Sequence, residues 1–121
     1  MNTKSKLNSN DKVSIRAIVL NMREYKSNDS GMLKKIDTGS NIYTVCYKYS
    51  LADGIRYSVL KHEKSGKFVG DAPIIRISEH GLEYNNCNSQ ISLPASVSIY
   101  IRDFNNYLNA FIKYGEQAFN F

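Results

Sequence analysis

The spacing of the apolar residues changes at Pro94, and this change limits the folds open to the chain. Before Pro94, segments of alternating polar and apolar residues predict β-strands, in which successive side chains point to opposite faces. After Pro94, apolar residues recur at every third or fourth position, as they do on one face of a helix. The sequence therefore predicts an α+β fold, in which an antiparallel curved sheet of four to five strands is followed by one C-terminal amphipathic helix.

The sheet is expected to use five segments, and polar or glycine-containing segments are expected to connect them. The predicted strands are Val13–Leu20, Ile42–Ser50, Ile55–Glu63, Ile74–Glu79 and Gln90–Leu93. The predicted connections are a long loop at Tyr25–Asn41, turns at Ala52–Gly54 and Lys64–Lys67, and a polar loop at Asn85–Ser89. Ser96 or Ser98 is expected to cap the helix, and Gly115 to end it.

A chain of 121 residues fits one domain, which we expect to span residues 13–121. Residues 1–12 contain three lysines and, after Met1, a single apolar residue, Leu7, so they predict a flexible basic arm. No apolar run approaches the roughly 18–20 residues that a membrane span requires. No apolar segment of signal-peptide length follows the N-terminus either, so we expect an intracellular protein that is neither secreted nor membrane-bound.

The motifs of the common enzyme classes are missing from the sequence. It has no nucleophile elbow, no Walker motif and no dinucleotide-binding glycine pattern. The residues Cys46, His62, His80 and Cys87 lack the paired spacing of a zinc site. We therefore expect a protein that is not an enzyme, with no cofactor and no metal. A ribonuclease-like acid–base pair of His62 and His80 is the catalytic alternative.

Basic and aromatic residues are interleaved along the predicted strands. The chain has a net charge of +5, nine Tyr and five Phe, and its pI is about 9.2. Cations neutralise phosphates and flat rings stack on unpaired bases, so this combination favours binding of single-stranded DNA or RNA. These positions occupy both faces of the strands, so we expect only part of the set to bind. The candidate binding residues are Tyr47, Lys48, Tyr49, Arg56, Tyr57, Lys61, Lys64, Lys67, Phe68 and Arg76.

Two segments of the second half of the chain are similar to a known repeat. They are Ile74–Glu79 and the stretch from Ser89-Gln90-Ile91-Ser92-Leu93 to the helix with Arg102-Asp103-Phe104, Tyr107-Leu108 and Phe111-Ile112. Together they resemble the second half of a PUR repeat, as in the Pur-alpha family of single-stranded nucleic-acid-binding proteins. Lys64–Phe68 is similar to the basic glycine hairpin of that repeat. The resemblance implies the ββββα fold that PUR repeats share with Whirly proteins, dimerised into a β-rich binding surface.

Two alternatives remain open at this point. An OB-fold barrel with a C-terminal helix would use the same strands and bind the same class of ligand. A small interaction protein or inhibitor would instead bind a protein partner through an edge strand or the tyrosine face. Since one helix covers only part of a sheet face, we also expect a homodimer or a higher homo-oligomer.

Overall fold

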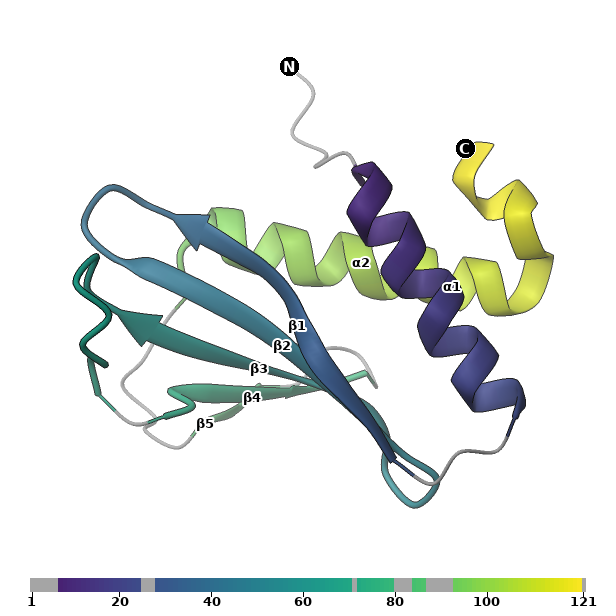
Figure 1. Cartoon of the computed structure of the whole chain (residues 1–121), viewed down its shortest axis with the longest axis horizontal. Coiled ribbons are helices and arrows are strands. Elements are labelled where there is room, and N and C mark those ends of the chain that lie inside the picture. The colour runs from purple at the N-terminus through teal and green to yellow at the C-terminus, as the bar shows by residue number, and fades with distance from the viewer. Residues whose placement is uncertain (1–6, 25–27, 71, 80–83, 87–92, 121) are drawn as a thin grey trace.

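The computed structural model describes residues 7–24, 28–70, 72–79, 84–86 and 93–120, with the backbone alone at 84–86. Two long helices pack on one side of an antiparallel sheet (Figure 1). In chain order the elements are α1 (Ser9–Arg23), β1 (Asn28–Asp37), β2 (Ile42–Ser50), β3 (Gly54–His62), β4 (Ile75–Ser78), β5 (Tyr84–Asn86), α2 (Ala95–Tyr114) and the 3₁₀-helix η1 (Gly115–Asn120).

The strands form a meander in which each strand pairs with the next. The order is β1-β2-β3-β4-β5, all pairs are antiparallel, and β5 adds only three residues to the edge of β4. This confirms an α+β protein with an antiparallel sheet before a long C-terminal helix. β1 and β5 lie at opposite edges, so the described strands form an open sheet rather than the closed barrel of the OB-fold alternative.

The first element differs from the prediction, because Val13–Leu20 lies in helix α1 and not in a strand. A capping box begins the helix: the Asn8 side chain accepts from the Asp11 backbone N–H at 2.9 Å, and the Asp11 carboxylate accepts from the Asn8 N–H at 3.1 Å. These bonds satisfy two backbone donors that the first turn leaves without helical partners. Residues 8–12, predicted as part of a flexible arm, therefore form the cap and first turn of α1; residues 1–6 lie outside the described residues.

The core explains why the helix replaces the predicted strand. Ile15, Ile18 and Val19 are fully or almost fully buried, at the three- and four-residue spacing of one helix face. Val13, which shares the alternating pattern with Ile15, is 60% exposed. The alternation of β-branched residues in this segment also contained a helical period, and packing of α1 against α2 uses that period.

Two connections also differ from the prediction. The expected long loop at Tyr25–Asn41 contains β1, which pairs with β2 from Asn28↔Ser50 to Asp37↔Ile42 around a bulge between Met32 and Lys34. The expected polar loop at Asn85–Ser89 overlaps β5. Of the expected strand Gln90–Leu93, residues 90–92 lie outside the described residues and Leu93 is not in a strand.

The remaining predicted elements are confirmed, with small shifts at their ends. β2, β3 and β4 coincide with predicted strands, and turns occur at residues 51–53 and after Glu63. α2 begins at Ala95 after Pro94, without a side-chain cap, so the expected cap by Ser96 or Ser98 is wrong. It ends at Gly115, whose φ of 68° favours glycine.

The core lies between the two helices and the sheet face toward them. Val97, Ile101, Phe104 and Leu108 on α2 are almost completely excluded from solvent. The sheet contributes every second residue of its central strands to the same cluster, among them Val45, Ile55, Tyr57, Val59, Ile75 and Ile77. This leaves the opposite face of the sheet for the polar and basic residues of the same strands.

Candidate nucleic-acid interface

The tyrosine face predicted to stack bases is the face that the helices cover. Tyr57 is only 1% exposed, and its hydroxyl donates to Asn105 Oδ1 on α2 at 2.7 Å. Its ring meets that of Phe104 edge-on, with 6.2 Å between centroids. Burial raises the pKa of the Tyr57 phenol far above its ordinary value. The prediction that Tyr57 stacks on a base is therefore wrong, because its ring belongs to the core.

Three further candidates lie on the same covered face. Tyr47 and Tyr49 are partly buried against the core, and the Tyr47 hydroxyl donates to Asp29 Oδ2 at 3.0 Å. Burial, together with this bond, raises the pKa of Tyr47 to about 12. The ammonium of Lys61 lies over the Tyr43 ring, 5.8 Å from its centroid. The structure thus separates these residues from the basic candidates on the other face.

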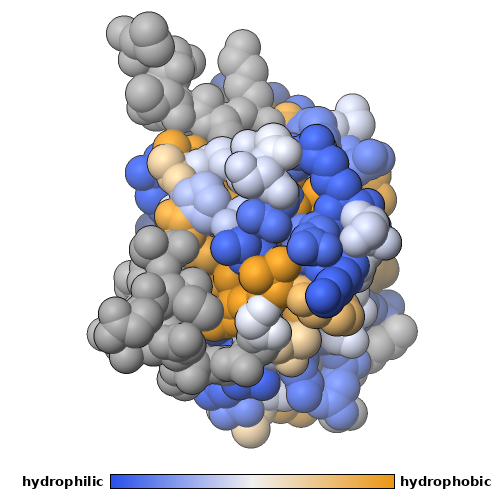
Figure 2. Space-filling view, turned by 90° about the vertical axis from the view of Figure 1, so that its left-hand side faces the viewer, coloured by the Kyte–Doolittle hydropathy of each residue, from blue (hydrophilic) through white to orange (hydrophobic). Residues whose placement is uncertain are grey.

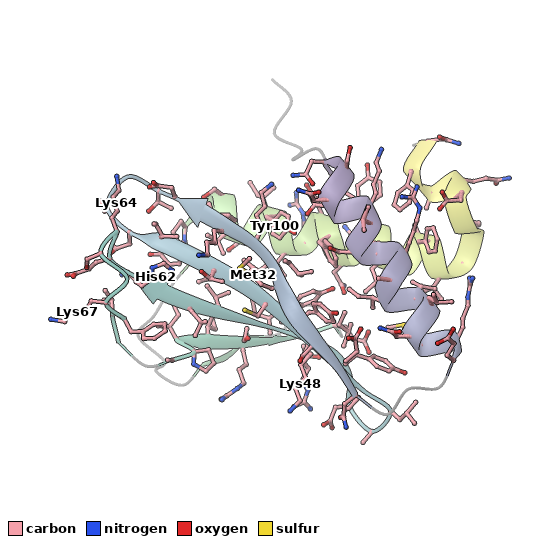
Figure 3. All side chains as sticks on the ribbon, in the orientation of Figure 1. Met32, Lys48, His62, Lys64, Lys67 and Tyr100 are labelled. Carbon is pink, nitrogen blue, oxygen red and sulfur yellow. The ribbon has the colours of Figure 1, made fainter. Side chains whose placement is uncertain are left out.

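We call the opposite surface the open face, because no described helix covers it. Cross-strand pairing arranges its side chains in rows, since directly opposite residues share a face. Lys48 lies on the open face, and Figure 3 shows that its side chain points away from α1 and α2. The rows are Ser30–Lys48–Arg56–Ser78, Met32–Cys46–Ser58–Arg76, Lys35–Thr44–Leu60 and Asp37–Ile42–His62.

Three predicted cations converge on a cavity in the open face. Lys48 on β2 lies directly opposite Arg56 on β3, and Arg76 on β4 lies opposite Ser58, in the next row. All three side chains belong to exposed residues. We call the hollow between them the cationic cavity; its volume is about 180 Å³. It is lined by Lys48, Ser50, Asp53, Arg56, Tyr57, Ser58 and Arg76.

The cavity has an excess of positive charge. The one carboxylate among the described residues that line it, on Asp53, lies 3.3 Å from the Arg56 guanidinium. The formal charge of the described lining side chains is +2, from three cations and one carboxylate. The Ser50 hydroxyl accepts from the Asp53 backbone N–H at 3.1 Å, so its own proton can be donated. The cavity therefore presents guanidinium, ammonium and hydroxyl donors toward one small volume, an arrangement suited to an anion.

The three candidates of the β3–β4 connection lie at the other end of the open face. Lys64 and Lys67 point outward there (Figure 3), and Lys64 lies 3.9 Å from Asp37. Phe68 is 54% exposed and pairs with His62 through an isolated bridge. From Arg56 to His62 the strand rises by about 20 Å, at roughly 3.3 Å per residue. Figure 2 views this end and shows hydrophilic residues around a smaller apolar patch.

The middle of the open face is less polar than its ends. Met32 is 58% exposed beside Cys46, and Leu60 is half-buried in the next row. Burial raises the pKa of the Cys46 thiol, so the group is a protonated thiol rather than a reactive thiolate at neutral pH. Two apolar side chains, Met32 and Leu60, thus lie between the cationic cavity and Phe68, and we call them the apolar strip.

His62 is held by neighbours of its own. Its Nε2 lies 3.1 Å from the Thr44 hydroxyl, and its Nδ1 lies 3.2 Å from the Glu63 carbonyl oxygen, to which it donates. His80, the partner in the catalytic alternative, lies outside the described residues. Within the described ranges, no three side chains of His, Cys, Asp or Glu gather as a metal site would require.

Several residues of this face were not among the candidates. Ser50, Asp53 and Ser58 line the cavity, and Met32 and Leu60 form the apolar strip. The alternation of β3 places Ser58 on the face of Arg56, so this signal was present in the sequence. Asp53 could not be found in that way, because its contact depends on how the β2–β3 turn folds back.

Comparison of the chain with family models, with curated proteins and with solved structures found no match. None of the helices in the described part of the chain is long and apolar enough to cross a membrane. The site must therefore be interpreted from its own geometry and charge.

Proposed function

We propose that this protein binds single-stranded DNA or RNA on the open face of its sheet. The observation that supports the proposal is the cationic cavity, where Lys48, Arg56 and Arg76 from three adjacent strands surround one space. Like charges placed directly opposite each other on neighbouring strands destabilise a sheet. An arrangement that costs stability is typical of a functional site, and here a phosphate would neutralise the charges.

The bases would contact the remainder of the open face. The apolar strip of Met32 and Leu60 leads from the cavity to Phe68, whose exposed ring is suited to stacking. Base stacking on an aromatic ring contributes about 1–3 kcal/mol and tolerates any base. A duplex hides its bases and offers only phosphates to such a surface, so we expect a preference for single strands.

The resemblance to the PUR repeat adds less to the proposal than the cavity does. Its helix motif forms part of α2, where Phe104, Leu108 and Phe111 are buried. Packing against a sheet requires apolar residues at these positions in any protein. In addition, α1 precedes the sheet, so the described order is not the ββββα order that the resemblance implies.

A homodimer stays a prediction. It was expected because one helix could not cover a sheet face, but α1 provides a second helix on that face. Size-exclusion chromatography with light scattering, with and without an oligonucleotide, measures the oligomeric state in each condition.

Fluorescence anisotropy with labelled oligo-dT, oligo-U and a duplex tests the proposal. We expect single strands to bind more tightly than duplex at low salt, and Lys48→Gln to weaken binding by about tenfold, as one charge-assisted contact implies. Lys113→Gln on α2 removes the same charge away from the open face and is the matched control. No binding of either single strand at low salt would refute the proposal.

One observation favours a second candidate, a module that binds a protein partner. Met32 and Phe68 are more than half exposed on the same face, and exposed apolar side chains are frequent at protein interfaces. The same titration separates the two candidates. A protein-binding module would leave both oligonucleotides unbound at low salt.

A further inference from the structure

The cationic cavity gathers three cations of the open face at one end of that face. A strand of phosphodiesters carries one negative charge per nucleotide, and a protein that follows such a strand needs a track of cations. Here Lys48, Arg56 and Arg76 line one cavity, the next two rows contribute Lys35 as their one cation, and Lys64 and Lys67 lie beyond those rows at the other end of the face. This distribution suits one compact anion with more than a single charge.

The cavity also has donors and dimensions that match such an anion. Each guanidinium has five N–H donors and the ammonium has three, and the hydroxyls of Ser50 and Ser58 add to them. A phosphodiester offers two non-bridging oxygens, whereas a phosphate monoester exposes three and carries about −1.5 to −2 charge at neutral pH. The volume of about 180 Å³ is below the roughly 300–1,000 Å³ of pockets that enclose drug-sized ligands. A phosphate group fits this space better than a whole nucleotide.

The cavity lies at one end of the open face, next to the β2–β3 turn. Ser50 ends β2, and Asp53 immediately precedes β3. From this end, the open face extends about 20 Å along β3 toward Phe68, at roughly 3.3 Å per residue. A nucleic-acid strand whose terminal phosphate occupies the cavity would thus have the whole open face for its bases.

We propose that the cationic cavity binds the terminal phosphate monoester of a nucleic-acid strand, so that the protein recognises phosphorylated strand ends. This inference rests on the proposed function. Lys48, Arg56 and Arg76 hold the phosphate oxygens, and the hydroxyl of Ser50 donates to the same group. The adjoining nucleotides lie along the apolar strip.

The test compares three oligonucleotides of one sequence: with a 5′-phosphate, with a 3′-phosphate and with neither. At neutral pH and constant salt, we expect one phosphorylated form to bind about tenfold more tightly than the unphosphorylated one. The advantage should shrink below about pH 6, where the monoester takes up a proton. Inorganic phosphate should reduce it at constant ionic strength.

Variants test whether the preference for a terminal phosphate depends on the cationic cavity. Arg76→Gln and Lys48→Gln should remove the phosphate preference, whereas Lys113→Gln should keep it; circular dichroism and thermal unfolding check that each variant is folded. Equal affinity of all three oligonucleotides would overturn the inference and leave the proposed function standing. No binding of any of them would overturn both. A preference that persists in both cavity variants would place the terminal phosphate elsewhere and also contradict the inference.

Discussion

Adjacent residues of β3 have opposite environments, and this explains their different roles. The Arg56 side chain is 53% exposed on the open face, while the next residue, Tyr57, is buried beneath α2. Strand geometry produces this difference, because successive side chains point to opposite faces. A substitution at Arg56 should therefore change binding, and a substitution at Tyr57 should change stability.

Tyr57→Phe should destabilise the fold without weakening oligonucleotide binding. The substitution removes the Tyr57 hydroxyl, which donates to Asn105 Oδ1 at 2.7 Å, and it leaves that buried oxygen without this hydrogen bond. We expect a loss of about 1–3 kcal/mol in the free energy of unfolding, measured with urea. Tyr49→Phe, which changes a partly buried tyrosine of the same face, is the control. A folded Tyr57→Phe protein with weaker oligonucleotide binding would contradict the placement of Tyr57 in the core.

Alkaline titration should separate the tyrosines by burial. The folded-state pKa of Tyr47 is raised to about 12, above the ordinary value near 10. Its contribution to stability is therefore complete below about pH 10 and is lost as the pH rises toward 12. Phenolate absorbance should increase in a late phase that Tyr47→Phe diminishes, while urea-unfolded protein should titrate in one phase. A single phase near pH 10 in protein that is still folded would contradict this prediction.

At the scale of the element, the C-terminal 3₁₀-helix is fastened to both long helices. The ring of Phe119 stacks on Phe111 with 5.3 Å between centroids, and the Arg16 guanidinium lies 5.0 Å from the Phe119 centroid. Arg16 also donates to both Glu116 carboxylate oxygens, at 2.9 Å and 2.8 Å. This bond lowers the pKa of Glu116. η1 thereby joins the end of α2 to the exposed side of α1.

Phe119→Ala should weaken this attachment by a moderate amount. Because Phe119 is only partly buried, we expect a loss of about 1–2 kcal/mol in the free energy of unfolding, against roughly 3–5 for the fully buried Phe104→Ala. Hydrogen exchange in η1 should become faster, and oligonucleotide binding should not change. An effect on unfolding as large as that of Phe104→Ala would show that η1 belongs to the central core.

The elements differ in how far the sequence determines them. The sequence predicts β2, β3 and α2 because each has one strong periodicity, and Gly54 and Gly115 mark the start of β3 and the end of α2. The sequence does not predict β1, because an exposed edge strand needs few apolar residues. Most residues of β1 are polar, among them Lys, Asp and Ser. The apolar residues of α1 fit both the two-residue period of a strand and the 3.6-residue period of a helix. The spacing of Asn8 and Asp11, which matches a capping box, is the feature that indicates a helix.

At the scale of the whole molecule, the two layers decide which predicted residues can share a site. Strand alternation places Lys48 and Arg56 on the face of the sheet away from the buried tyrosines. The sequence therefore indicates that the two cations share a face. The inclusion of Arg76 depends on the register of β4 against β3, which no local pattern specifies. Lys61 differs from Arg76 in this respect, because the alternation of β3 already places it on the covered face with Tyr57 and away from Arg56.

The salt dependence of single-strand binding tests the central claim, that Lys48, Arg56 and Arg76 bind phosphates on the open face. For single strands, the logarithm of the affinity changes by about −0.7 per phosphate contact for each tenfold increase in salt. Together the three cavity cations contribute at most about −2 to the slope, and each single Gln variant should make the slope less steep, while Lys113→Gln should not. A slope that is the same in the wild-type protein and in all three cavity variants would contradict the claim.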